Sequence, residues 1–250
     1  MSKQGTPIWY ELMTPDLAAA QRFYENVLGW KIADSGMAGM DYRLASAGDA
    51  MVAGLMPPPR EGIPANWGIY FAVADCDAAA RDAQSAGASI CLPATDIPGV
   101  GRFAVLTDPQ GAVFNILKGE GSDSQAFDQS KPGHGNWQEL MTTDPKAAQS
   151  FYGKLFGWSE ARVHDMGPMG GYHIISHDGR EIGGMMGLGG APMACWLPYF
   201  GSAGIDSSAK RIAAAGGKVI RGPMEVPGGA FIVVATDPQG AHFAIVGPKG

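Results

Sequence analysis

Two glutamates at equivalent places, Glu11 and Glu139, are the residues whose type and position best suit chemistry. Each belongs to a stretch that the chain carries twice, over residues 9–30 and 137–158. The stretch opens with alternating side chains typical of a strand, so the glutamate shares a face with the tryptophan two positions before it. Burying a carboxylate on the inward face of a sheet costs free energy unless it is hydrogen-bonded, ion-paired or hydrated. It could be a general base or an anchor for a ligand's donor groups, or a structural carboxylate bonded to Arg or Tyr.

The repeat continues beyond this stretch and divides the chain. Matching positions in WYELMTPDLAAAQRFYENVLGW and WQELMTTDPKAAQSFYGKLFGW are 128 apart, and the later TDPQGA segments at 107–112 and 236–241 are 129 apart. A similarity of this length indicates two homologous halves. We therefore predict a first module over 1–118, a polar Gly/Ser-rich linker over 119–135 and a second module over 136–250.

Each half contains the order strand, helix and three strands twice. In the first unit Asp16 is suited to cap a helix and Gly29 to end it, and the DPQG segments have the composition of hairpin turns. Further helices are expected over 77–86, 144–156 and 205–215. An open four-stranded sheet must have its apolar face covered, and pairing two units achieves this. The expected class is α+β, with four βαβββ units paired into two cupped, incomplete β-barrels and helices outside.

Composition excludes several partners. The chain has 46% hydrophobic residues and a formal net charge of −6. A nucleic-acid partner would favour a basic surface, so none is expected. No run approaches the roughly 18 apolar residues of a membrane span. The start MSKQGTPIWYEL lacks the apolar region of a signal peptide, so we expect a cytoplasmic protein without a membrane partner.

The repeated motifs resemble a known superfamily. Four βαβββ units, the start D-x-x-x-A-x-x-F-Y-x-x-x-L-G-W and the late D-P-x-G turn are similar to the vicinal oxygen chelate superfamily, which includes glyoxalase I, extradiol dioxygenases and bleomycin-resistance proteins. The resemblance covers nearly the whole chain and is nearest to the two-module, glyoxalase-like hydroxylase group. Motifs of this kind specify a fold more strongly than a function.

The resemblance also implies where metal ligands would lie. Metal-dependent members place His, Gln or Glu at four strand positions in each cup. Here these correspond to Trp9, a position near Ala53, Gly68 and Asn115, and to Trp137, a position near Gly183, Leu197 and Ala244. None of these is His, Glu or Asp, and a divalent metal needs three or four converging ligands. We therefore expect no metal ligand and no cofactor.

The same landmarks identify the side chains that would enter the cups. Besides the two glutamates they are Trp9, Trp137, Tyr70, Tyr199, Asn115 and His242. If the first unit faces the fourth, as the resemblance implies, Glu11 and His242 share one cup and could transfer protons as an acid–base pair. If the first two units close together instead, the pair is separated. His242 could also be a satisfied core group.

Two classes of function fit this pattern. The first is a metal-independent lyase, isomerase or hydroxylase-type enzyme that uses a glutamate base on a small planar or carbonyl-containing compound. The second is a binding protein that sequesters such a compound without turnover, as resistance proteins do. Because the duplication supplies an internal pseudo-dimer, we expect a monomer whose partner is a small molecule.

Overall fold

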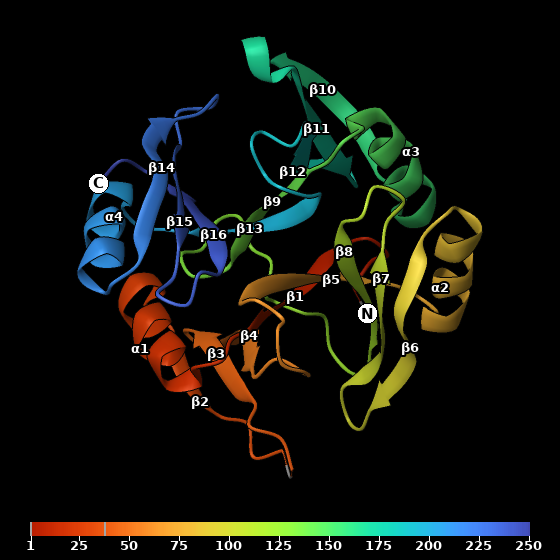
Figure 1. The fold of residues 1–250 in the computed structure, drawn as a ribbon, viewed down its shortest axis with the longest axis horizontal. Coiled ribbons are helices and arrows are strands. Elements are labelled where there is room, and N and C mark those ends of the chain that lie inside the picture. Colours follow the sequence, from red (N-terminus) through yellow and green to blue (C-terminus); the bar gives the residue numbers. More distant parts are fainter. Residues whose placement is uncertain (1, 38) are drawn as a thin grey trace. The chain divides into compact units, whose positions relative to one another are not determined.

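The computed structural model describes residues 2–37 and 39–250, which form four α-helices and sixteen strands (Figure 1). The strands of the first half are β1 (Pro7–Met13), β2 (Lys31–Asp34), β3 (Arg43–Ala47), β4 (Ala50–Met56), β5 (Asn66–Ala72), β6 (Ser89–Ile97), β7 (Gly101–Thr107) and β8 (Val113–Gly119). Those of the second half are β9 (Gly135–Met141), β10 (Ser159–Asp165), β11 (Gly171–His177), β12 (Arg180–Met186), β13 (Cys195–Gly201), β14 (Lys218–Glu225), β15 (Phe231–Thr236) and β16 (His242–Gly247).

The helices begin and end within one residue of the positions that the sequence indicates. In α1 (Leu17–Leu28) the Asp16 carboxylate accepts a 2.9 Å hydrogen bond from the Ala19 amide, and Gly29 ends the helix at φ 71°. The repeat-related α3 (Pro145–Phe156) is capped and terminated in the same way. The other two helices are α2 (Cys76–Ser85) and α4 (Ile205–Ala214). Caps of this kind satisfy amides and carbonyls that a helix end leaves without partners.

The strands form two mixed eight-stranded sheets, one from each half of the sequence. Their strand orders are β2-β3-β4-β1-β5-β8-β7-β6 and β10-β11-β12-β9-β13-β16-β15-β14. The first and last strands of each unit are parallel, as in β1 with β4 and β5 with β8, and the remaining pairs within a unit are antiparallel. This is the βαβββ arrangement four times over. The predicted fold class is confirmed, with open sheets rather than closed barrels.

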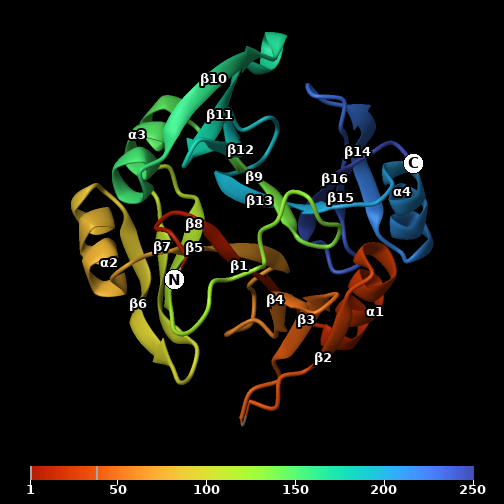
Figure 2. The same cartoon turned by 180° about the vertical axis from the view of Figure 1, so that it is seen from behind.

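The chain folds into two compact units, and each draws on both halves of the sequence. Compact unit 1 comprises the N-terminal segment up to Ile8 with Ile69–Ser124 and Trp137–Leu197. Compact unit 2 comprises Trp9–Gly68, Gln125–Asn136 and Pro198–Gly250. Helices α2 and α3 accordingly lie together in the first, and α1 and α4 in the second (Figures 1 and 2). The first βαβββ unit therefore associates with the fourth, and the second with the third.

Each compact unit has an aromatic core crossed by a buried hydrogen-bond chain. In compact unit 2 the indole of Trp67 donates to the hydroxyl of Tyr24 at 2.9 Å, and this hydroxyl donates to Asp237 at 3.1 Å. In compact unit 1, Trp196 donates to Tyr152 at 3.1 Å, and Tyr152 donates to Asp108 at 2.9 Å. The aspartates belong to the two DPQG turns. Each of these hydrogen-bond chains therefore links a helix of one half of the sequence to a turn of the other half.

No helix among the described residues is both long and apolar enough to cross a lipid bilayer.

Candidate functional site

The first candidate site centres on a hydrogen-bonded chain in compact unit 2. The indole N–H of Trp9 donates to the hydroxyl oxygen of Tyr42 at 3.1 Å, and that hydroxyl donates to Oε2 of Glu11 at 3.0 Å. Along β1 the burial alternates, so that Trp9 and Glu11 are half-buried while Tyr10 is fully buried. The predicted alternation of side chains is therefore present. Glu11 has a tyrosine partner, as the structural interpretation of this carboxylate requires.

Compact unit 1 contains the same series of hydrogen bonds at the repeat-related positions. Trp137 donates to the hydroxyl of Tyr172 at 2.9 Å, and Tyr172 donates to Oε2 of Glu139 at 2.9 Å. Trp137 and Glu139 are half-buried, as their counterparts are. The geometry is thus preserved in both halves, although the two chains lie in different compact units. We call each of these a Trp–Tyr–Glu chain.

A glycine on the neighbouring strand makes room for each tyrosine hydroxyl. Strand register pairs Glu11 with Gly54 and Glu139 with Gly184. A Cβ on Gly54 would overlap the hydroxyl of Tyr42, and one on Gly184 would overlap the ring of Tyr172. Any side chain at these positions would displace the tyrosine from its glutamate.

This register narrows one inherited ligand position in each half, which the sequence places only near Ala53 and near Gly183. Ala53 pairs with Tyr10 and Gly183 with Gln138, so neither lies on the glutamate face. The residues on that face are the glycines one position later. Counting from sequence landmarks gives the position only approximately, because β3 to β4 and β11 to β12 each contain a register shift that the sequence does not reveal.

The tyrosines of the two chains stay protonated at neutral pH. Burial raises the pKa of Tyr42, and the negative charge of Glu11 raises it further. Burial and the charge of Glu139 raise the pKa of Tyr172 in the same way. A phenol in this environment donates its proton to the carboxylate but does not release it. Each chain therefore carries its negative charge on the glutamate.

The remaining predicted site residues divide between the compact units. Tyr70 and Asn115 are paired across β5 and β8 in compact unit 1, and both are buried. Tyr199 is buried in compact unit 2, where it pairs with Ala244, and His242 is exposed as the first residue of β16. Glu11 and His242 thus belong to one compact unit, as the pairing of the first with the fourth unit requires. Whether their side chains line one cavity stays a prediction.

Tyr42 and Tyr172 were missed by sequence reasoning. They recur 130 positions apart, as Gly54 and Gly184 do, and this differs from the spacing of 128 at the glutamates. The two extra residues lie between the first helix of each half and the tyrosine. In this segment β10 of the second half has seven residues, whereas β2 of the first half has four. An alignment of the halves that allowed this insertion would have matched the two tyrosines.

The side chains at the family's metal positions do not fit a divalent cation. In the first half only one of the four positions has a side chain that could ligate a metal, the amide of Asn115; the others are Trp9, Gly54 and Gly68. In the second half none of the four has a metal-ligating atom, since they are Trp137, Gly184, Leu197 and Ala244. Within residues 2–37 and 39–250, no three His, Cys, Asp or Glu side chains converge to hold a metal ion. These residues provide no basis for a metal-dependent step.

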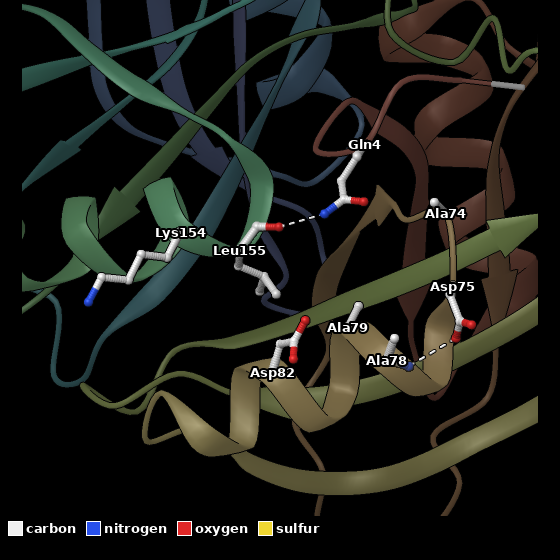
Figure 3. Close-up of a pocket in the computed structure, with 8 residues that line it drawn as sticks. All are labelled: Gln4, Ala74, Asp75, Ala78, Ala79, Asp82, Lys154 and Leu155. Carbon is white, nitrogen blue, oxygen red and sulfur yellow. Dashed lines mark hydrogen bonds between the residues drawn. The ribbon is translucent and has the colours of Figure 1, made fainter.

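A separate groove of about 260 Å³ lies between the start of α2 and the end of α3 (Figure 3). Gln4 donates its amide to the carbonyl of Leu155, and Asp75 caps α2 through the amide of Ala78. Asp82 and Lys154 add opposite charges to its rim. Two of its polar groups are thus engaged in structural bonds, so we assign the candidate site to the Trp–Tyr–Glu chains.

Fold and site together define a class: two-module proteins of paired βαβββ units whose inner faces carry polar and aromatic side chains. The family model described as "Glyoxalase/Bleomycin resistance protein/Dioxygenase superfamily" matches residues 7–116 and again 136–245. The chain belongs to this superfamily, and each half is one copy of its domain.

Two curated relatives span almost the whole chain. "Putative glyoxylase CFP32" of Mycobacterium tuberculosis is 33% identical over 98% of this chain and 96% of its own length. "Anthracycline biosynthesis protein DauV" of Streptomyces sp. (strain C5) is 32% identical over 97% of this chain and 93% of its own length.

Among solved structures, the 2,3-dioxygenase LapB from Pseudomonas sp. KL28 is similar in fold. It has a TM-score of 0.70 and 14% sequence identity, with 98% of this chain and 93% of LapB covered. The Mn(II)-bound glyoxalase from Novosphingobium aromaticivorans has a TM-score of 0.66 and 16% identity, with 98% and 83% covered. At this identity the likeness concerns the fold alone.

Proposed function

We propose that the protein binds a small planar, aromatic or carbonyl-containing compound beside the Trp–Tyr–Glu chain of each compact unit. The observation that supports this most is that the chain is built twice with the same hydrogen-bond directions and nearly the same distances. An apolar aromatic surface with one oriented polar group is the usual composition of a small-molecule site. Trp9 and Trp137 provide the surface, and Glu11 and Glu139 provide the polar group.

The relatives support a ligand of this kind. One is named for anthracycline biosynthesis, and anthracyclines are planar aromatic compounds. Another is named a glyoxylase, which concerns a small carbonyl compound. The proposal assigns binding rather than turnover to the glutamates, because one oxygen of each already accepts a hydrogen bond from a tyrosine hydroxyl.

Binding in this form uses no divalent cation, since the inherited ligand positions hold tryptophan, glycine, leucine, alanine and asparagine. The functional form is a monomer. The association of one βαβββ unit from each half supplies the contacts that a dimer of single modules would otherwise provide. Its partner is the small molecule alone, consistent with a net charge of −6 that disfavours nucleic acid.

Calorimetric titration with three planar probes tests the proposal: 2-naphthol, 2-methoxynaphthalene and 2-naphthoate. At least one should bind the wild-type chain. The E11Q/E139Q double variant, which keeps the shape of both side chains, should bind that probe roughly tenfold or more weakly. The matched control is E61Q, because Glu61 is exposed and lies outside both chains. Wild-type protein that bound none of the three probes would refute the proposal.

A second candidate is metal-independent proton transfer by Glu11 and His242. It is favoured by one observation, that both residues belong to compact unit 2. For a small substrate to bridge them, their side-chain tips must line one cavity within about 10 Å, given hydrogen-bond reach of roughly 3 Å at each end. Catalysis would appear in NMR spectra as solvent deuterium entering the α-carbon of 2-tetralone. The rate should fall in both E11Q and H242N, and equal rates in all three proteins would exclude the pair.

A further inference from the structure

The direction of the hydrogen bonds in each chain restricts what a ligand can offer. An indole N–H is only a donor, so the hydroxyl oxygens of Tyr42 and Tyr172 accept from their tryptophans. The single hydroxyl proton of each tyrosine is then directed to the carboxylate, at 3.0 Å for Glu11 and 2.9 Å for Glu139. An ionised carboxylate is only an acceptor. Neither the tyrosine nor the glutamate of a chain therefore has a proton to give to a ligand.

The charge of each chain points the same way. Because the pKa of both tyrosines is raised by burial and by the adjacent carboxylate, the phenols remain neutral and the negative charge stays on the glutamate. Both glutamates are half-buried rather than fully enclosed. An acidic ligand group placed there would meet a like charge, whereas a neutral or cationic donor would be attracted.

We propose that the ligand is held through a hydrogen-bond donor, a phenolic hydroxyl or an amine, and that each polypeptide binds two such ligands, one in each compact unit. This inference rests on the proposed function and names the chemical class of its ligand. It differs from recognition of an acid, which would need Arg, Lys or amide donors at the same place.

Two sites follow from the equivalence of the two chains. Each consists of the same three residue types, and in each the register places a glycine where the tyrosine hydroxyl passes over the neighbouring strand. Because all residues of a chain come from a single compact unit, neither site borrows a residue of its chain from the other. The donor-accepting chemistry is therefore present twice in one polypeptide.

The three probes already named distinguish the chemistry, because they share one ring system. 2-Naphthol carries a donor, 2-methoxynaphthalene has lost it, and 2-naphthoate carries a negative charge at pH 7. We expect 2-naphthol to bind with a stoichiometry near two and roughly tenfold or more tightly than either other probe. E11Q and E139Q should each weaken one of the two sites and leave the other, while E61Q should keep both.

Each other outcome has a distinct meaning. If the methyl ether or the naphthoate bound as tightly as 2-naphthol, the donor inference would be wrong while the proposed binding function remained. A stoichiometry of one that a single variant abolished would refute the two-site inference in the same way. Failure of all three probes would refute the proposed function, and this inference with it. Circular dichroism of each variant establishes that it is folded before its binding is interpreted.

Discussion

The hydroxyl of Tyr24 donates a 3.1 Å hydrogen bond to the carboxylate of Asp237, which lies 213 positions later in the chain. Tyr152 and Asp108 repeat the relationship at 2.9 Å in the other compact unit. Both bonds are fully buried and join a helix from one half of the sequence to a turn from the other. The two halves of the sequence are therefore joined by two buried hydrogen bonds between repeat-related residues.

The first prediction concerns the stability of these bonds. Tyr24→Phe removes the acceptor of the buried Trp67 indole and one of the hydrogen-bond donors to Asp237. We expect a loss of about 1–3 kcal/mol in the free energy of unfolding, measured with urea. Tyr152→Phe should lose a similar amount, and the two losses should add because the residues share no partner. A change below about 0.5 kcal/mol in either variant would mean that the bond is not stabilising.

The second prediction is a pH dependence. Burial raises the pKa of Asp108 above its ordinary value of 3.8, although its backbone and Tyr152 hydrogen bonds act in the opposite direction. The folded state thus binds this proton more tightly than the unfolded state. The resulting stabilisation is complete below about pH 3.8 and is lost as the pH rises through the folded-state pKa. Asp108→Asn, which cannot titrate, should therefore be more destabilising at pH 4 than at pH 7. Denaturant unfolding at both pH values measures this, and an equal or larger penalty at pH 7 would contradict it.

The third prediction tests the glycines beneath the tyrosines. Gly54→Ala places a methyl group where the Tyr42 hydroxyl lies, so the bond to Glu11 should break. We expect a loss of about 1–3 kcal/mol in stability and of one binding site for 2-naphthol, with Gly184→Ala acting on the other. Gly119→Ala is the matched control, since nothing lies within 4 Å of its Cβ position. Unchanged binding in both test variants would show that the tyrosine bond does not shape the sites.

The fourth prediction compares two equivalent glycines that each accept a hydrogen bond from a buried tryptophan. Gly5 accepts from Trp158 at 3.0 Å and Gly133 from Trp30 at 2.7 Å. Both have a positive φ, but a Cβ on Gly5 would lie 2.7 Å from Phe156, whereas one on Gly133 would meet Ala47 at 3.1 Å. Gly5→Ala should therefore lower the thermal midpoint more than Gly133→Ala does. The reverse order would contradict the packing argument.

The fifth prediction concerns metal content. Because the inherited ligand positions lack the donors that Zn, Fe, Ni or Mn require, elemental analysis of purified protein should find well below one of these metals per chain. Treatment with EDTA should leave the affinity for 2-naphthol unchanged. About one metal per chain, lost when Glu11 or Glu139 is replaced, would overturn the prediction.

Local signals predicted much of the fold. Asp16 and Gly29 each encode a helix boundary by a short-range hydrogen bond or a left-handed backbone, and both are found as expected. Alternation along residues 9–13 likewise gave the correct faces of β1. What the sequence left open was long-range, namely which units associate, because homologous units have the same apolar faces and either pairing would cover them.

The site was only half predictable for a related reason. Glu11 and Glu139 lie in the stretch where the two halves align without a gap, so the repeat identified them directly. Their partners Tyr42 and Tyr172 follow segments of different length, and their role depends on a hydroxyl crossing over Gly54 or Gly184 from the next strand. A cross-strand contact of this kind depends on register, which bulges shift by one residue without leaving a sequence signal.

The interleaved make-up of the compact units sets an order of events during synthesis. All residues of compact unit 1 have been made once Leu197 has left the ribosome, whereas compact unit 2 still needs the segment Pro198–Gly250. At about 5–20 residues per second, the first βαβββ unit waits roughly 10–40 s for its partner. During that interval the aromatic face around Tyr24 is uncovered, so Trp9–Gly68, although made early, is among the last parts of the chain to be protected from aggregation.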